Sequence, residues 1–98
     1  MPLRDRFRCA CLAALIATTL GCVQAPVQEM SDARQALAAA REVARDDLDR
    51  ADIERAEQLL DDAEAALEAG RYSDARIDAG SAREMAIEVR ERATQKRR

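Results

Sequence analysis

Residues 31 to 69 contain neither proline nor glycine, and this uninterrupted stretch limits the possible folds more than any other feature of the chain. Alanine, glutamate, arginine and leucine dominate it, and all four are strong helix formers. Gly70 follows directly and is a natural helix stop. The sequence therefore predicts an all-α fold, with helices over residues 31–44, 52–69 and 73–93.

Two serines and an acidic segment set the expected helix ends. Ser31 and Ser73 are good N-caps, and each is followed by an aspartate, which the helix dipole favours in the first turn. Residues 45–52 interrupt the regular spacing of apolar residues. They contain four aspartates: Asp46, Asp47, Asp49 and Asp52. They lack the glycine and glutamate that an EF-hand needs. We interpret this segment as a solvated turn that also caps the second helix, and we expect no metal or cofactor.

Each predicted helix carries one apolar stripe with spacings of three and four residues. The stripes are Met30, Ala33, Leu37, Ala40 and Ala44; Ile53, Ala56, Leu60, Ala63 and Leu67; and Tyr72, Ala75, Ala79, Ala82, Ala86, Val89 and Ala93. Such stripes on both sides of a tight turn predict an antiparallel hairpin with closely approaching axes. Leu59, Ala66 and Met85 widen the apolar face of the hairpin. We expect the first helix to cover that flank, giving a small antiparallel three-helix bundle.

The N-terminus has the pattern of a secretory signal. Three arginines, Arg4, Arg6 and Arg8, precede an uncharged run over residues 9–20. That run has the length of a signal-peptide apolar region, about 7–15 residues, and is shorter than the roughly 20 residues that span a bilayer. An ordinary signal peptide cut after Ala25, or an uncleaved anchor, are the alternatives.

The run ends in Thr19-Leu20-Gly21-Cys22, which resembles the lipobox of bacterial lipoproteins. The resemblance implies that Cys22 is acylated and becomes the first residue of the mature chain. Residues 1–21 are then a lipoprotein signal peptide, 22–30 the lipid anchor and tether, and 31–98 the alanine-rich helical domain. Val23 is not the aspartate that retains lipoproteins in the inner membrane, so the resemblance implies the periplasmic side of the outer membrane.

The mature chain offers little for catalysis or nucleic-acid binding. Residues 22–98 hold 13 basic and 18 acidic side chains, so the net charge of −5 does not favour nucleic acid. Cys9 and Cys11 leave with the signal peptide, the chain has no histidine, and no serine has a base at a suitable spacing. We therefore expect no enzyme activity. The basic tail 96–98 is interpreted as a solvated helix end.

The turn between the second and third helices resembles two known families. Gly70, Tyr72 and Ala75 match the Gly-x-Tyr-x-x-Ala turn of a tetratricopeptide hairpin, which implies that the tyrosine fills the corner. Only one such unit is present, whereas solenoids need about three. Residues 31–93 as a whole resemble the alanine-rich bacterial lipoprotein family called domain of unknown function 4398 (DUF4398), whose turn is similar to Gly70-Arg71-Tyr72. This resemblance implies a location and a shape, and no reaction.

One set of residues lies away from the apolar stripe of the third helix. At about 100° per residue, Ile77, Gly80 and Ile87 fall on its outer side. They are a candidate face for a protein partner of unknown identity or for a second copy of the chain. The sequence therefore favours a membrane-anchored structural or protein-interaction module of the cell envelope. The alternative is a single-hairpin, tetratricopeptide-like adaptor that recruits an envelope enzyme or a peptidoglycan-linked partner.

Overall fold

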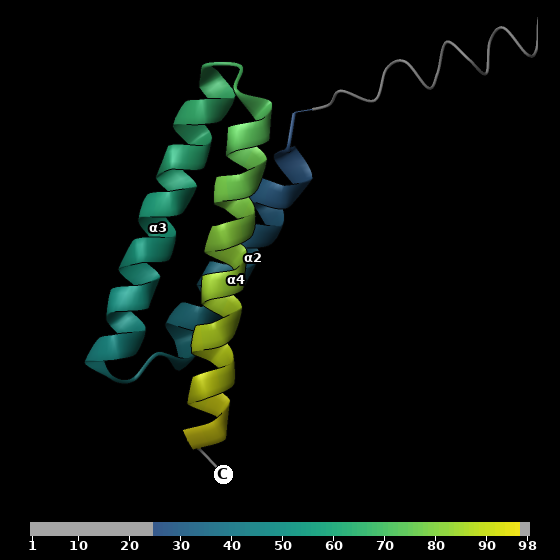
Figure 1. Cartoon of the computed structure of the whole chain (residues 1–98). Coiled ribbons are helices and arrows are strands. Elements are labelled where there is room, and N and C mark those ends of the chain that lie inside the picture. The colour runs from purple at the N-terminus through teal and green to yellow at the C-terminus, as the bar shows by residue number, and fades with distance from the viewer. Residues whose placement is uncertain (1–24, 97–98) are drawn as a thin grey trace, which may run out of the picture.

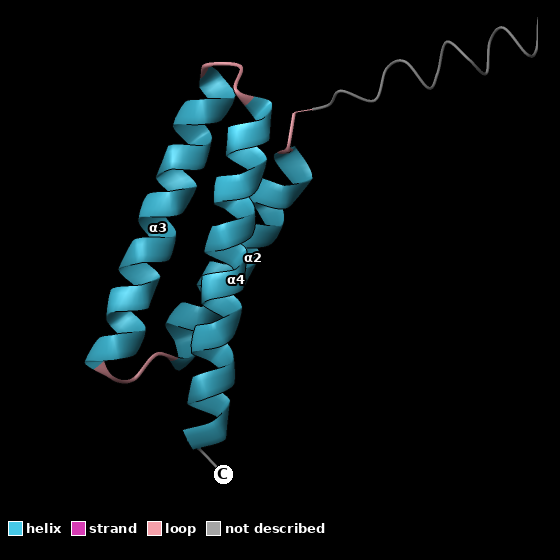
Figure 2. Ribbon diagram, in the orientation of Figure 1, coloured by secondary structure: helices cyan, strands magenta, loops and turns pink. Residues whose placement is uncertain are grey.

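The computed structural model describes residues 25–96, and three helices make up most of this part of the chain (Figure 1). Helix α2 spans Val27–Val43, α3 spans Asp47–Glu68 and α4 spans Tyr72–Lys96. Figure 2 shows short loops between them, and no strand occurs among the described residues. The all-α prediction is confirmed. The predicted signal peptide and the lipidation site Cys22 lie outside the described residues.

Successive helices run in opposite directions, so α3 is antiparallel to α2 and α4, which are parallel to each other (Figure 1). Helix α4 packs extensively on both other helices, whereas α2 and α3 contact each other less. The start of α2 and the turn around Gly70 lie at one end of the bundle, which we call the Gly70 end. The turn around Asp46 and the last turn of α4 lie at the other, the Asp46 end (Figure 1).

Alanine side chains make up most of the core. The buried apolar residues are Met30, Ala33, Leu37, Ala40, Ile53, Ala56, Leu60, Ala63, Ala66, Ala75, Ala79, Ala82, Ala86, Val89 and Ala93. The predicted stripes are confirmed at most positions; Ala44 and Leu67 are only partly buried, and Tyr72 is exposed. Because alanine extends so little from the backbone, the helix axes approach closely where these residues face each other.

Helix α2 begins four residues earlier than predicted. Its N-cap is Pro26, and Ser31 lies inside the helix, where its hydroxyl accepts a hydrogen bond from Gln35 at 3.4 Å. Met30, predicted to end the tether, is fully buried in the core. Burial of this large side chain favours a helix that includes it, so the predicted boundary at Ser31 was wrong.

Helix α3 also begins earlier, at Asp47 rather than near Asp52. Asp46 is its N-cap and accepts a hydrogen bond from the backbone N–H of Asp49 at 2.8 Å. The aspartates that suggested a turn are instead the cap and the first turns of the helix, where the dipole favours negative charge. The predicted turn over residues 45–52 was therefore too long.

The side of the α3–α4 hairpin that α2 covers also differs from the prediction. Arg34 and Arg41 of α2 form ion pairs with Glu64 and Glu57 of α3, at 2.7 Å and 2.6 Å. Leu59 lies two residues beyond Glu57, about 200° further round the helix. Helix α2 does pack on the hairpin, but on the flank away from the one that Leu59 widens.

The turn after α3 follows the Schellman pattern, as the glycine stop predicts. Gly70 has a φ of 76°, and its N–H donates to the carbonyl of Leu67 at 3.1 Å. The N–H of Arg71 donates to the carbonyl of Ala66 at 2.8 Å. These two bonds satisfy carbonyls at the end of α3 and reverse the chain into α4.

We expect Gly70→Ala and Gly80→Ala to change stability in opposite directions. A Cβ at either position would meet no atom within 4 Å, so backbone conformation alone decides the effect. At Gly70 the positive φ costs an alanine about 1–2 kcal/mol, whereas at the helical Gly80 alanine gains about 1 kcal/mol. Urea unfolding followed by circular dichroism measures both. Changes of the same sign would contradict this account of the turn.

Candidate functional site

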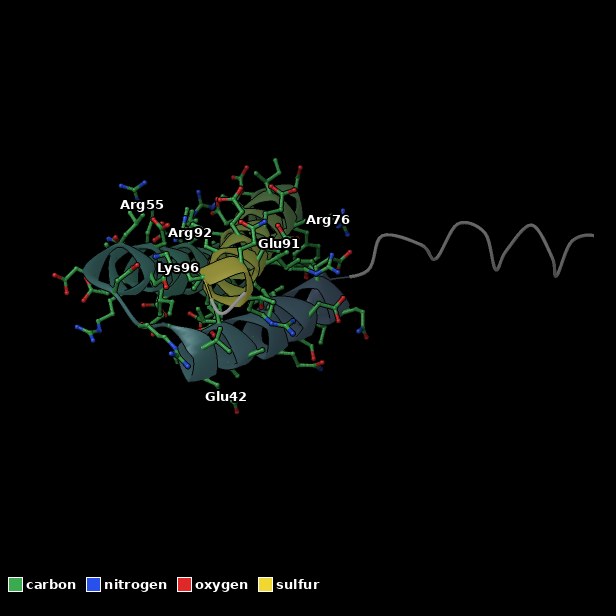
Figure 3. The ribbon with its side chains drawn as sticks, turned by 90° about the horizontal axis from the view of Figure 1, so that it is seen from below. Glu42, Arg55, Arg76, Glu91, Arg92 and Lys96 are labelled. Carbon is green, nitrogen blue, oxygen red and sulfur yellow. The ribbon has the colours of Figure 1, made fainter. Side chains whose placement is uncertain are left out.

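A cluster of charged side chains lies at the Asp46 end of the bundle and contains the one buried charged residue among those that the structure describes. Arg92 of α4 donates to Oδ1 of Asp49 at 3.1 Å and to Oδ2 of Asp52 at 2.7 Å. The Asp49 carboxylate is fully buried, although it is charged. Lys96 forms an ion pair with Asp46, the N-cap of α3. Figure 3 shows Arg92 and Lys96 on the side of α4 that faces α3.

Every carboxylate of this cluster has a partner. Asp49 also accepts a hydrogen bond from the backbone N–H of Arg45, at 3.5 Å. No buried side-chain nitrogen or oxygen in the described part of the chain lacks a hydrogen bond. The hydrogen bond from Lys96, and then that from the backbone of Asp49, lower the pKa of Asp46. Hydrogen bonds to Asp52 and Asp49 raise the pKa of Arg92.

The arrangement therefore fixes the last turns of α4 against the start of α3, and sequence reasoning missed it. The predicted solvated turn is wrong at Asp49. Lys96 is exposed, as predicted for the tail, but it is helical and forms an ion pair. The spacing of Asp46 and Asp49 resembles a capping box, which was a usable signal for the start of α3. No local signal pairs Asp49 with Arg92, because 43 residues separate them.

The predicted corner residue, Tyr72, is the first residue of α4 and is 36% exposed. Glu29 of α2 pairs with Arg76 of α4 at 3.3 Å, so the two helices begin within about one turn of each other along the bundle axis. The side chain of Tyr72 is thus not buried in the stripe, and its filling of the corner, which the tetratricopeptide resemblance implies, stays a prediction. Ala75 is fully buried, in agreement with its place in the stripe.

The structure places the residues of the candidate partner face on two flanks of α4. Ile77 lines an open hollow of about 310 Å³ together with Ala65 and Ala66 of α3. Ile87, which is partly buried, lines another of about 400 Å³ together with Ala36 of α2. Gly80, also partly buried, lies between them in sequence. The three residues do not form one continuous apolar surface, and their binding of a partner stays a prediction.

Large apolar side chains are exposed at four positions of the described chain. Val27 is 61% exposed, Leu48 57%, Tyr72 36% and Ile77 63%. Val27 and Tyr72 are the first residues of α2 and α4, and Ile77 follows about one turn later. Three of these four side chains therefore lie at the Gly70 end, and Leu48 lies at the Asp46 end.

Within residues 25–96, no group of acidic, histidine or cysteine side chains is arranged to hold a metal ion. No helix in the same part of the chain is long and apolar enough to cross a bilayer. No family model, curated protein or solved structure matches this chain.

Proposed function

We propose that this protein is a lipid-anchored module of the bacterial cell envelope, attached through Cys22 to the periplasmic side of the outer membrane. The observation that carries the proposal is in the sequence. A short uncharged run follows three arginines and ends in Leu20-Gly21-Cys22, the arrangement of a lipobox.

The composition beyond the anchor supports a single modified thiol. The three cysteines of the chain are Cys9, Cys11 and Cys22, and removal of residues 1–21 would leave only the last. A domain without further cysteines forms no disulfide bond, so its stability must come from non-covalent contacts. The alanine core and the ion pairs of Arg92 are contacts of this kind.

The role we propose is structural or protein-interacting. The hollows on the bundle are open and bordered by charged side chains, unlike the mostly apolar pockets that bury small molecules. The bundle instead offers exposed helix faces, with Ile77 and Ile87 on separate flanks of α4. The resemblance to DUF4398 supports the envelope location and the helical shape, and it assigns no role.

A tetratricopeptide-like adaptor is the second candidate. The glycine turn at Gly70 and the buried Ala75 support it. The exposure of Tyr72 weakens it, because the tyrosine of that hairpin fills the corner. The envelope module is therefore the function that we favour.

Replacement of the lipidation site tests the proposal. In a Gram-negative host, we expect Cys22→Ser to prevent acylation and lipoprotein processing, so the product keeps its signal segment or leaves the membrane fraction. The double variant Cys9→Ser, Cys11→Ser is the matched control, and its processing and membrane retention should equal those of the unmodified chain. Retention of Cys22→Ser at the membrane with an unchanged mature mass would contradict the proposal. Fractionation with intact-mass measurement provides both readouts.

A further inference from the structure

The Gly70 end of the bundle exposes a group of apolar side chains that the core does not need. Val27, Tyr72 and Ile77 are between 36% and 63% exposed. Glu29, the third residue of α2, pairs with Arg76, the fifth residue of α4, so the two helices begin at similar heights at this end of the bundle. The three side chains thus lie within about two helical turns of one another along the bundle axis, but on different sides of this end, since the five residues from Tyr72 to Ile77 turn by about 140° around α4. We call them the end patch.

The distance to the proposed anchor decides what can cover the end patch. Five peptide steps join Cys22 to Val27, and each spans at most about 3.6 Å, so the two Cα atoms are no more than about 18 Å apart. Helix α4 has 25 residues and, at about 1.5 Å per residue, is roughly 37 Å long. A lipid on Cys22 therefore holds the Gly70 end near the bilayer, while the Asp46 end can stand well away from it.

We infer that the end patch is a membrane-contacting surface that rests on the bilayer carrying the lipid anchor. The inference rests on the proposed acylation of Cys22. Tyrosine is enriched at membrane interfaces, where its ring lies among the headgroups. Val27 and Ile77 add apolar area beside it. Acyl chains hold the protein at the membrane, and the end patch sets the orientation in which it is held.

The charges around the end patch specify the type of lipid contact. Asp74 pairs with Arg71 at 3.7 Å, and Glu29 pairs with Arg76. Asp62 and Asp78 lie close to Ile77 around the same hollow. This end has no basic excess, so the contact is apolar and made with zwitterionic headgroups. Anionic lipid should not strengthen it.

Tryptophan reporters test the orientation, because the chain contains no tryptophan. The acylated full-length product of each variant is purified from the envelope and reconstituted into phosphatidylcholine vesicles with brominated acyl chains. Tyr72→Trp should show a blue-shifted emission and strong quenching. Leu48→Trp, at an apolar position of the opposite end that is more exposed than Tyr72 (57% against 36%), should show neither. Adding phosphatidylglycerol should not increase the quenching of Tyr72→Trp.

Several results would overturn the inference. Quenching of neither reporter means that the bundle does not touch the bilayer, and equal quenching of both means that it lies along the surface. Quenching that requires phosphatidylglycerol would show an electrostatic contact instead. Circular dichroism checks that each variant is folded, and Ile77→Trp replaces Tyr72→Trp if the latter is not. The acyl mass on Cys22 is measured on the same samples, so a failed orientation is distinguished from a failed lipoprotein assignment.

Discussion

Arg92→Leu is expected to destabilise the bundle by about 3 kcal/mol, because it leaves the Asp49 carboxylate buried without its charged partner. Asp49 is fully buried, whereas Arg92 retains partial exposure, with 30% of its side-chain surface accessible. This places the cost near the lower end of the 3–5 kcal/mol typical of broken buried pairs. In a domain of this size such a loss is a large part of the total stability. Urea unfolding followed by circular dichroism measures it.

Two further variants separate charge burial from loss of side-chain contact. Arg90→Leu changes an exposed arginine on the same helix and should alter stability by less than about 0.5 kcal/mol. The double variant Asp49→Leu, Arg92→Leu removes both charges and should recover much of the lost stability. If the double variant is less stable than Arg92→Leu alone, the buried carboxylate is not the source of the cost.

Ala79→Leu is the second large effect, with an expected loss of about 1–3 kcal/mol from overpacking. Ala79 is completely buried on the stripe of α4, and its small size permits the close approach of the neighbouring helices. Thermal melting followed by circular dichroism should show a clearly lower midpoint. Ala38→Leu, at an exposed position inside α2, is the control and should melt close to the unmodified protein. A midpoint for Ala79→Leu equal to that of the control would mean that the core is not tightly packed.

The sequence predicted the helices and their buried faces well, because both follow from local composition and periodicity. Ala79 and Ala82 lie in the core as their spacing requires, and Gly70 ends α3 as a glycine stop does. The helix starts at Val27 and Asp47 were missed for a common reason. Residues that typically precede a helix are also tolerated in its first turns, and burial of Met30 extended α2 beyond its apparent cap.

The polar cluster and the surface faces could not be predicted from spacing. Burial of Asp49 depends on Arg92, which only the completed fold brings to it. The separation of Ile77 from Ile87 depends on which flank of α4 each neighbouring helix covers. Helical periodicity predicts the angle of each residue around its own helix axis, but it does not predict where the neighbouring helices pack.

We propose above all that Cys22 is the acylated first residue of the mature protein. The most direct test is mass spectrometry of the N-terminal peptide of the protein recovered from the envelope of a Gram-negative host. We expect a peptide that begins at Cys22 and carries a diacylglyceryl group, with residues 1–21 absent. A peptide that begins after Ala25, or one that retains residues 1–21 with an unmodified Cys22, would contradict it.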